Sequence, residues 1–155
     1  KVLKKTKNMK KINSILMVIL FAVLLVNTGC KKEGCTDPDS INYDSEAKKD
    51  DGSCEYIASA VFWFNEATSD SLLAYDVTSF TIFVDDEEVG TLDVSDYLTG
   101  EPYCGQESAI TVMKNLGSDK TRQSSYSVID QDGYEILSGR VNFVANTCPA
   151  IQLVY

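Results

Sequence analysis

The pattern of hydrophobic and polar positions divides the chain into three stretches. Residues 15–26 form an unbroken run of twelve apolar side chains. Residues 34–56 are polar and rich in turn-forming residues, with no apolar repeat of 2 or 3.6 positions. From residue 57 onward, apolar and polar side chains alternate in short runs that end at turn residues. The pattern therefore predicts a hydrophobic segment, an irregular polar segment and a β-domain.

The β-domain is expected to contain eight short strands and no helix longer than one turn. That turn is expected within residues 92–99, and residues 85–88 are expected to be a polar, solvated turn. The sequence Gln-Asp-Gly at 131–133 is a strong hairpin signal. Short strands separated by turns indicate an all-β fold, a sandwich or open barrel. The strands are expected at residues 58–64, 78–84, 89–93, 109–113, 125–129, 134–137, 141–144 and 151–155.

The hydrophobic segment has the features of a secretory signal. The lysines at 10–11 form a positive region before the apolar run, and Gly29 places a small residue before Cys30. Twelve apolar residues are fewer than the roughly 20 that a membrane-spanning helix needs. Because the chain begins with Lys1, Met9 is the expected initiator.

Residues 27–30 resemble the lipobox of bacterial lipoproteins, in which signal peptidase II cuts before a cysteine that carries a diacylglyceryl group. Thr28 and Gly29 fit this pattern, whereas Asn27 stands where leucine or another aliphatic residue is usual. The resemblance implies a palmitate-bearing anchor on Cys30 in the outer membrane, with the remaining chain periplasmic or surface-exposed. The alternatives are a signal peptide without lipidation, or an uncleaved anchor in which the cysteine is incidental.

Cleavage after residue 29 would leave a strongly acidic chain. Eight Lys and Arg would remain against 23 Asp and Glu, a formal charge of −15. Such a field repels nucleic acids, so no nucleic-acid partner is expected. Histidine is absent from the sequence, which removes the usual general base, zinc ligand and catalytic triads. We expect no enzymatic activity, and the least favoured alternative is a small hydrolase that uses carboxylates alone.

Four cysteines remain when Cys30 is set aside, and an even number in an exported protein implies disulfides. Of the three possible pairings, sequence position favours Cys35–Cys54 and Cys104–Cys148, because each pair brackets a self-contained unit. The expected organisation is a signal segment, a lipidated tether, a disulfide-stapled motif and a β-sandwich domain, at residues 1–29, 30–33, 34–56 and 57–155 respectively.

The polar segment contains a set of residues at fixed spacing, which are Gly34, Cys35, Thr36, Asp37, Pro38, Asn42, Tyr43, Ala47, Asp50, Asp51, Gly52, Ser53 and Cys54. They resemble a short cysteine-bracketed motif of secreted and surface proteins of Bacteroidota-type bacteria. The resemblance implies an extracellular setting and a compact disulfide loop, and it implies no activity. A segment this polar cannot form a hydrophobic core of its own, so we expect a disulfide to stabilise it.

The same segment supplies candidate calcium ligands. Calcium takes six to eight oxygen ligands, but the spacing here does not match an EF-hand loop. The alternative is that these side chains cap turns. With calcium bound, the protein would be a calcium-stabilised adhesion or envelope-assembly component. The candidates are Asp37, Asp39, Asp44, Asp50 and Asp51.

The β-domain carries two looser resemblances. Residues 81–85 and 89–91 are similar to the strand–turn–strand of PEGA and carboxypeptidase-regulatory modules. The order of residues 62–64, 103–105 and 138–139, then Cys148 and 151–153, resembles a β-sandwich module of Bacteroidota lipoproteins. These resemblances imply a small disulfide-linked β-sandwich, immunoglobulin-like or of the PEGA type, after the signal peptide and the disulfide loop.

Aromatic residues are the remaining candidates for binding. Trp63 either offers a surface to a glycan or belongs to the core. Tyr97, Tyr103, Tyr126 and Tyr134 lie in or near turns, where tyrosine suits ligand contacts, although a β-protein needs no ligand to explain them. The expected function is a membrane-anchored, non-enzymatic binding or structural module. Its expected partner is a protein or glycan held at the loops.

Overall fold

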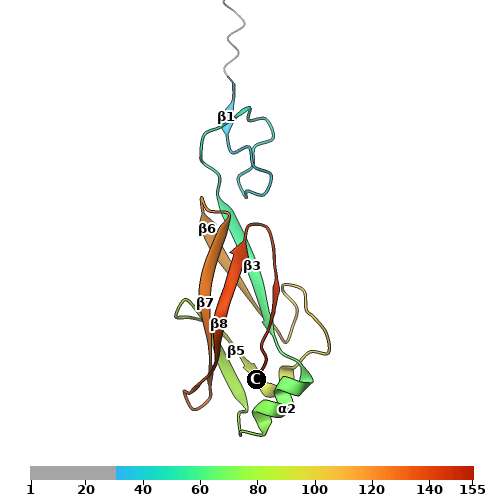
Figure 1. Ribbon diagram of the computed structural model, residues 1–155. Coiled ribbons are helices and arrows are strands. Elements are labelled where there is room, and N and C mark those ends of the chain that lie inside the picture. Colours follow the sequence, from blue (N-terminus) through green and yellow to red (C-terminus); the bar gives the residue numbers. More distant parts are fainter. Residues whose placement is uncertain (1–30) are drawn as a thin grey trace, which may run out of the picture. The chain divides into compact units, whose positions relative to one another are not determined.

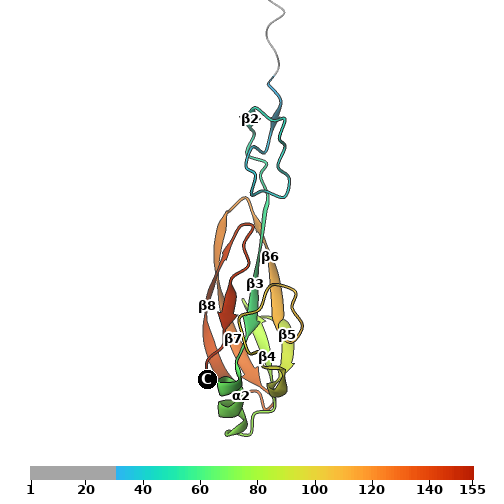
Figure 2. The same cartoon turned by 90° about the vertical axis from the view of Figure 1, so that its right-hand side faces the viewer.

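Two β-sheets pack face to face in the part of the chain that follows Cys54 (Figures 1 and 2). One sheet contains, in spatial order, β6 (Ile110–Gly117), β3 (Tyr56–Trp63) and β9 (Ala150–Gln152). The other contains β5 (Glu87–Asp93), β4 (Ser79–Val84), β7 (Thr121–Asp130) and β8 (Glu135–Val144). Neighbouring strands are antiparallel except for β3 and β9, which are parallel. The predicted all-β sandwich is confirmed.

The structure, a computed structural model, describes residues 31–155, and Glu33–Tyr155 forms one unit. The signal segment and the expected lipidation site Cys30 lie outside the described residues. Within the described part, no helix combines the length and the apolar character needed to span a bilayer.

The core lies between the two sheets and follows from the alternation along the strands. On β4, Phe80, Ile82 and Val84 are buried, whereas Thr81 and Phe83 lie on the opposite face, as predicted. Two edge-to-face ring contacts join the sheets or brace the core, Phe62 with Tyr126 at 5.3 Å and Phe64 with Phe80 at 5.2 Å between centroids.

One helix, α2 (Glu66–Leu73), was not predicted. Asn65 begins it, because its side chain accepts a hydrogen bond from the backbone N–H of Thr68. Its buried face carries Thr68 and Ser69 beside Leu72, so the sequence shows no apolar stripe. The hydroxyl of Thr68 donates to the carbonyl of Leu153 at 3.2 Å. The helix therefore depends on polar contacts that a hydrophobic pattern does not reveal.

The strands β6 and β7 are longer than those expected at 109–113 and 125–129, and the largest difference from the prediction is in β8. Residues 134–137 and 141–144, expected as two strands, belong to the single ten-residue strand β8. Gly139 lies at its middle, where a Cβ atom would come within 2.6 Å of the hydroxyl of Tyr126 on β7. Glycine at this position makes room for the ring of Tyr126. In the sequence it looks like the end of a strand, but the strand continues through it.

The predicted turns are largely confirmed. The 131–133 hairpin joins β7 to β8, with Gly133 at φ 88°. The helical turn expected within 92–99 is η1 (Val94–Asp96). The strand expected at 151–155 ends earlier, at Gln152.

The segment before the sandwich is held by one disulfide, whose buried cysteines belong to the hydrophobic core cluster, and by hydrogen bonds. It contains β1 (Glu33–Gly34) and β2 (Lys49–Asp50), which form a short parallel pair. The amide of Asn42 donates to the carbonyl of Ser53 at 2.6 Å and accepts from the backbone N–H of Glu55 at 2.9 Å. These bonds close the loop onto the start of β3.

Both disulfides that the cysteine positions favour are present. Cys35 and Cys54 close the motif with their Cα atoms 4.8 Å apart. Cys104 and Cys148 join the loop before β6 to the connection between β8 and β9, with Cα atoms 6.3 Å apart. One crosslink thus fixes the motif and the other ties together two long connections of the sandwich.

Candidate functional site

Four of the five candidate calcium ligands cap turns. The side chains of Asp37, Asp44, Asp50 and Asp51 each accept a hydrogen bond from the backbone N–H two residues further on, at 2.9–3.1 Å. This is the Asx-turn geometry in which an aspartate replaces a missing backbone partner. The interpretation of these residues as turn caps is therefore confirmed.

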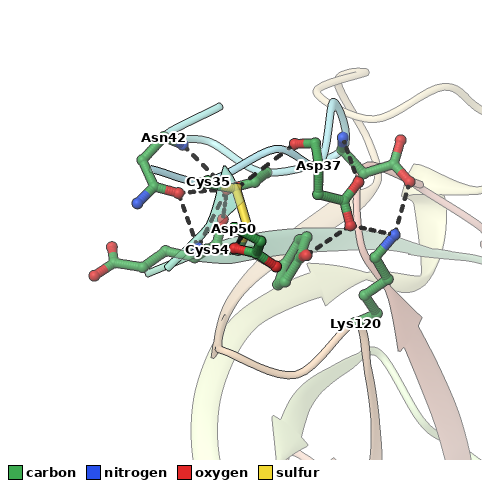
Figure 3. A network of polar contacts seen from close by, with 10 residues as sticks. Cys35, Asp37, Asn42, Asp50, Cys54 and Lys120 are labelled. Atoms are coloured by element: carbon green, nitrogen blue, oxygen red, sulfur yellow. Dashed lines mark hydrogen bonds and ion pairs between the residues drawn. A yellow bond between two sulfur atoms is a disulfide. The ribbon is translucent and has the colours of Figure 1, made fainter. Parts of the chain in front are cut away.

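Asp37 also connects the motif to the sandwich (Figure 3). Its carboxylate lies 2.5 Å from Nζ of Lys120, which precedes β7, and accepts a hydrogen bond from the hydroxyl of Tyr56 at 2.7 Å. Asp39 lies 3.4 Å from the same ammonium group. The hydrogen bonds from Lys120 and then Tyr56 lower the pKa of Asp37 from 3.8 to about 2. The motif is thus attached by an ionised carboxylate shared between two partners.

Acid should loosen this attachment. Because the pKa of Asp37 is lower in the folded state, its stabilising contribution is present above pH 3.8 and is lost as the pH falls toward 2. We expect Asp37→Asn to flatten the decline of the melting temperature between pH 5 and pH 2. Melting curves at stepped pH measure this. Asp70→Asn, which changes an exposed carboxylate on α2, is the control and should keep the wild-type decline. An unchanged slope in Asp37→Asn would contradict the assignment.

The structure does not bring the five aspartates together. Among residues 31–155, no group of three or more Cys, Asp or Glu side chains is arranged so that it could hold a metal ion. Lys120 occupies the space between Asp37 and Asp39. Calcium binding therefore stays a prediction without a geometric site.

Calcium should leave the stability unchanged if the carboxylates serve as turn caps. We expect the same melting temperature for the full chain in millimolar calcium and in chelator. Differential scanning calorimetry at low ionic strength measures it, with magnesium as the control for general screening. A rise of several degrees in calcium alone would show that the motif binds the metal.

A second polar cluster crosses between the sheets. Asp85 and Asp86 form the two-residue turn between β4 and β5, with φ of 51° and 64°, the left-handed values that such a tight hairpin turn requires. The carboxylate of Asp85 accepts from the hydroxyl of Ser124 at 2.8 Å and from the backbone N–H of Ser125 at 3.1 Å. Nζ of Lys114, on the facing sheet, lies 3.3 Å away. The turn was expected to be solvated, and for Asp85 this is wrong.

This cluster is partly buried. The side chains of Lys114 and Asp85 are 15% and 30% exposed. Desolvation raises the pKa of Asp85, but the hydrogen bonds from Ser124 and Lys114 lower it by more, so the pKa lies below its ordinary value. The cluster therefore pins the β4–β5 turn to the opposite sheet as an ionised pair.

Breaking one side of this pair should destabilise the fold. We expect Lys114→Met to lower the free energy of unfolding by about 1–3 kcal/mol, because it leaves the Asp85 carboxylate without its cation. Urea denaturation measures the loss. The double variant Lys114→Met/Asp85→Asn should recover part of it, since the charge left behind is removed. If the double variant loses as much unfolding free energy as the Lys114→Met and Asp85→Asn single variants together, the two groups do not interact.

An open depression lies on the outer face of the four-stranded sheet. Because Ile82 and Val128 point into the core, their neighbours Phe83 and Ser127 point outward. Phe83, Ser127 and Ser138 lie opposite one another on three adjacent strands. The depression has a volume of about 410 Å³. We call it the sheet-face trough, and its outward-facing residues are Phe83, Asp86, Ser125, Ser127, Glu135, Ser138 and Arg140.

The charges of the trough are few and separated. Arg140 lies opposite Ser125, one row from Ser138, and its guanidinium donates to the side-chain oxygen of Gln123 at 3.2 Å. Within residues 31–155 it forms no ion pair within 4 Å, unlike Lys114. Glu135 lies at the other end of the same strand segment. Most of the guanidinium's N–H groups are therefore available to a ligand.

The predicted aromatic candidates fall in different places. Trp63 is only 8% exposed, so its core assignment is confirmed. Tyr126 packs against the ring of Phe62. Tyr97, Tyr103 and Tyr134 are exposed on turns and loops, where the structure does not gather them into a pocket with the trough residues.

Sequence reasoning missed the trough. The alternation along residues 78–84 already placed Phe83 away from the core. The signal that could have identified the site is an outward aromatic residue combined with the serines at 125, 127 and 138 on neighbouring strands. Recognising it requires the strand register, which the sequence does not specify.

Comparisons of the chain with protein-family models, with curated proteins and with solved structures find no match.

Proposed function

We propose that this chain is an exported, lipid-anchored module of the cell envelope that binds a ligand in the sheet-face trough and does no chemistry of its own. The trough carries the binding part of the proposal. Its volume of about 410 Å³ falls in the range of small-molecule sites. Its lining combines one aromatic ring, Phe83, with polar side chains that can hydrogen-bond to a ligand.

Export is supported by the two disulfides. Such bonds form and persist in oxidising compartments and are rare in the cytosol. The apolar run at residues 15–26 and the cysteine at 30 provide a route for export and attachment. A lipid anchor with more than one chain would then hold the module firmly at the membrane.

Attachment is tested in cells with a clickable fatty-acid probe. The wild-type protein should incorporate the probe and partition with membranes. Cys30→Ser should incorporate none and be released into the soluble envelope fraction. Equal labelling of the two proteins would overturn the lipid anchor, and protease treatment of intact cells would then distinguish surface from periplasmic exposure.

Binding is tested by filling the trough. Ser127→Trp places a large ring on its floor, whereas Thr91→Trp places the same ring on the same sheet face but outside the trough. The full chain is crosslinked in intact cells to the envelope polymers and culture material around it. The crosslinked material should still be found on Thr91→Trp and should be lost from Ser127→Trp. Equal retention by both variants, with unchanged melting, would overturn the binding function.

A further inference from the structure

We propose that the sheet-face trough binds a neutral saccharide, with one sugar ring against Phe83 and its hydroxyl groups on the serines and Arg140. This inference rests on the proposed binding function and names the class of ligand. It follows from three properties of the trough: the layout of its rows, its hydrogen-bonding groups and its charge.

The strand register arranges the side chains in rows. Phe83, Ser127 and Ser138 form one row across β4, β7 and β8, and Ser125 with Arg140 forms the next. Strands lie about 4.8 Å apart, and residues on the same face recur about 7 Å along each strand. The serines are short and Phe83 is long, so a ligand lies over the serines and meets the ring as a wall.

Phe83 selects for an apolar face on the ligand. Its ring has no polar atom, and its negative face attracts weakly positive C–H groups. A pyranose presents such C–H groups on its flat faces and hydroxyl groups around its edge. A ligand that contacts the ring with C–H groups and the floor with hydroxyl groups therefore satisfies both parts of the trough.

The floor can exchange hydrogen bonds in both directions. Each of Ser125, Ser127 and Ser138 can donate one hydrogen bond and accept others, and sugar hydroxyl groups do the same. Arg140 adds donors beyond the one that contacts Gln123. Asp86 at one side and Glu135 at the far end add acceptors.

The charge of the site favours a neutral ligand. One cation and two carboxylates line the trough, in a chain with a formal charge of −9. That surplus repels acidic polymers. Arg140, which forms no ion pair within 4 Å among residues 31–155, is left to donate hydrogen bonds to uncharged oxygen atoms. A neutral polyhydroxylated ligand does not meet this repulsion and can use the donors of Arg140.

The position on the sheet argues against an extended peptide. Sheets bind peptides by adding them as a strand at an exposed edge, through backbone hydrogen bonds. Ser125 and Ser127 of the trough lie on β7, whose backbone is already paired with β4 on one side and β8 on the other, whereas Ser138 and Arg140 lie on the edge strand β8. A ligand that lies over β7 therefore contacts side chains, among them the hydroxyl groups of Ser125 and Ser127, and not backbone groups of that strand.

The experiment measures binding of the full chain, purified in detergent micelles, to neutral oligosaccharides of several sugars. Uronic-acid oligosaccharides and peptides of similar length are the comparison probes. We expect at least one neutral oligosaccharide to bind, and Phe83→Leu, which keeps bulk but removes the flat ring, to weaken it about tenfold or more. Arg140→Gln should weaken it less. Tyr134→Ala, at an exposed tyrosine outside the trough, should leave the affinity unchanged.

The outcomes separate this proposal from the proposed function. If only peptides or acidic saccharides bind, and Phe83→Leu weakens them, the trough is a binding site but the saccharide class is wrong. If a neutral saccharide binds equally to wild type, Phe83→Leu and Ser127→Trp, it binds elsewhere and the proposal is overturned. If no oligosaccharide binds the wild type, the proposal also fails, and crosslinking of Ser127→Trp against Thr91→Trp still decides the binding function.

Discussion

Replacing Cys104 and Cys148 together by serine is expected to lower the free energy of unfolding by as much as about 4 kcal/mol. The bond closes a loop with a sequence separation of 44 residues, and the unfolded chain gains entropy when that loop opens. It also joins two connections that contain little regular structure, so few other contacts hold them. Urea denaturation of the oxidised wild type and the double variant measures the loss.

The Cys35→Ser/Cys54→Ser variant is the matched control. Its loop is shorter, with a separation of 19 residues, and although its two cysteines are buried at the edge of the hydrophobic core cluster, the loop itself lies in the motif before the sandwich. We expect it to expose the motif to protease at Lys48 and Lys49 while the main unfolding transition of the sandwich changes less. If the two double variants lower the main transition equally, the motif and the sandwich unfold as a single cooperative unit.

Truncating Phe62 to alanine is expected to cost about 3–5 kcal/mol of unfolding free energy. Phe62 has no exposed surface, lies on the central strand β3, and contacts the ring of Tyr126 on the facing sheet. Removing its ring leaves a cavity between the sheets and takes away the packing partner of the Tyr126 ring. Chemical denaturation measures the loss, and a reduced heat-capacity change would indicate a loosened core.

Phe83→Ala is the control for Phe62→Ala, because the same side chain is removed from the outer face of the other sheet. We expect it to cost well under half as much stability and to affect ligand binding instead. Equal losses from the two variants would show that Phe83 belongs to the core, and the trough would lose its wall.

The sequence was sufficient for features that depend on local pattern. Alternation along residues 78–84 predicted the two faces of β4, and the Gln-Asp-Gly turn predicted the β7–β8 hairpin. The pairing of the cysteines could also be predicted, because each pair brackets a self-contained unit of the sequence. These features depend on neighbours in the chain, and such neighbours are visible in the sequence.

Features that depend on distant neighbours were not accessible. The helix α2 buries hydroxyl groups whose partners lie elsewhere in the chain, such as the carbonyl of Leu153. Lys114 and Asp85 are 29 positions apart and meet only because the sheets face each other. Predicting the trough likewise requires the register of three strands, because a shift of one strand by one residue would turn its serines toward the core.

The Cys35–Cys54 bond has a mechanical consequence. A pulling force applied to the chain before Glu33, such as the proposed lipid anchor would transmit, reaches β3 through this motif. Without the bond, the chain from Cys35 to Cys54, a sequence separation of 19, could stretch to about 65 Å. The crosslink holds the two Cα atoms at 4.8 Å, so a pulling force bypasses that slack. Reducing the bond would therefore add about 60 Å of reach to the chain before β3, roughly twice the length of the ten-residue strand β7.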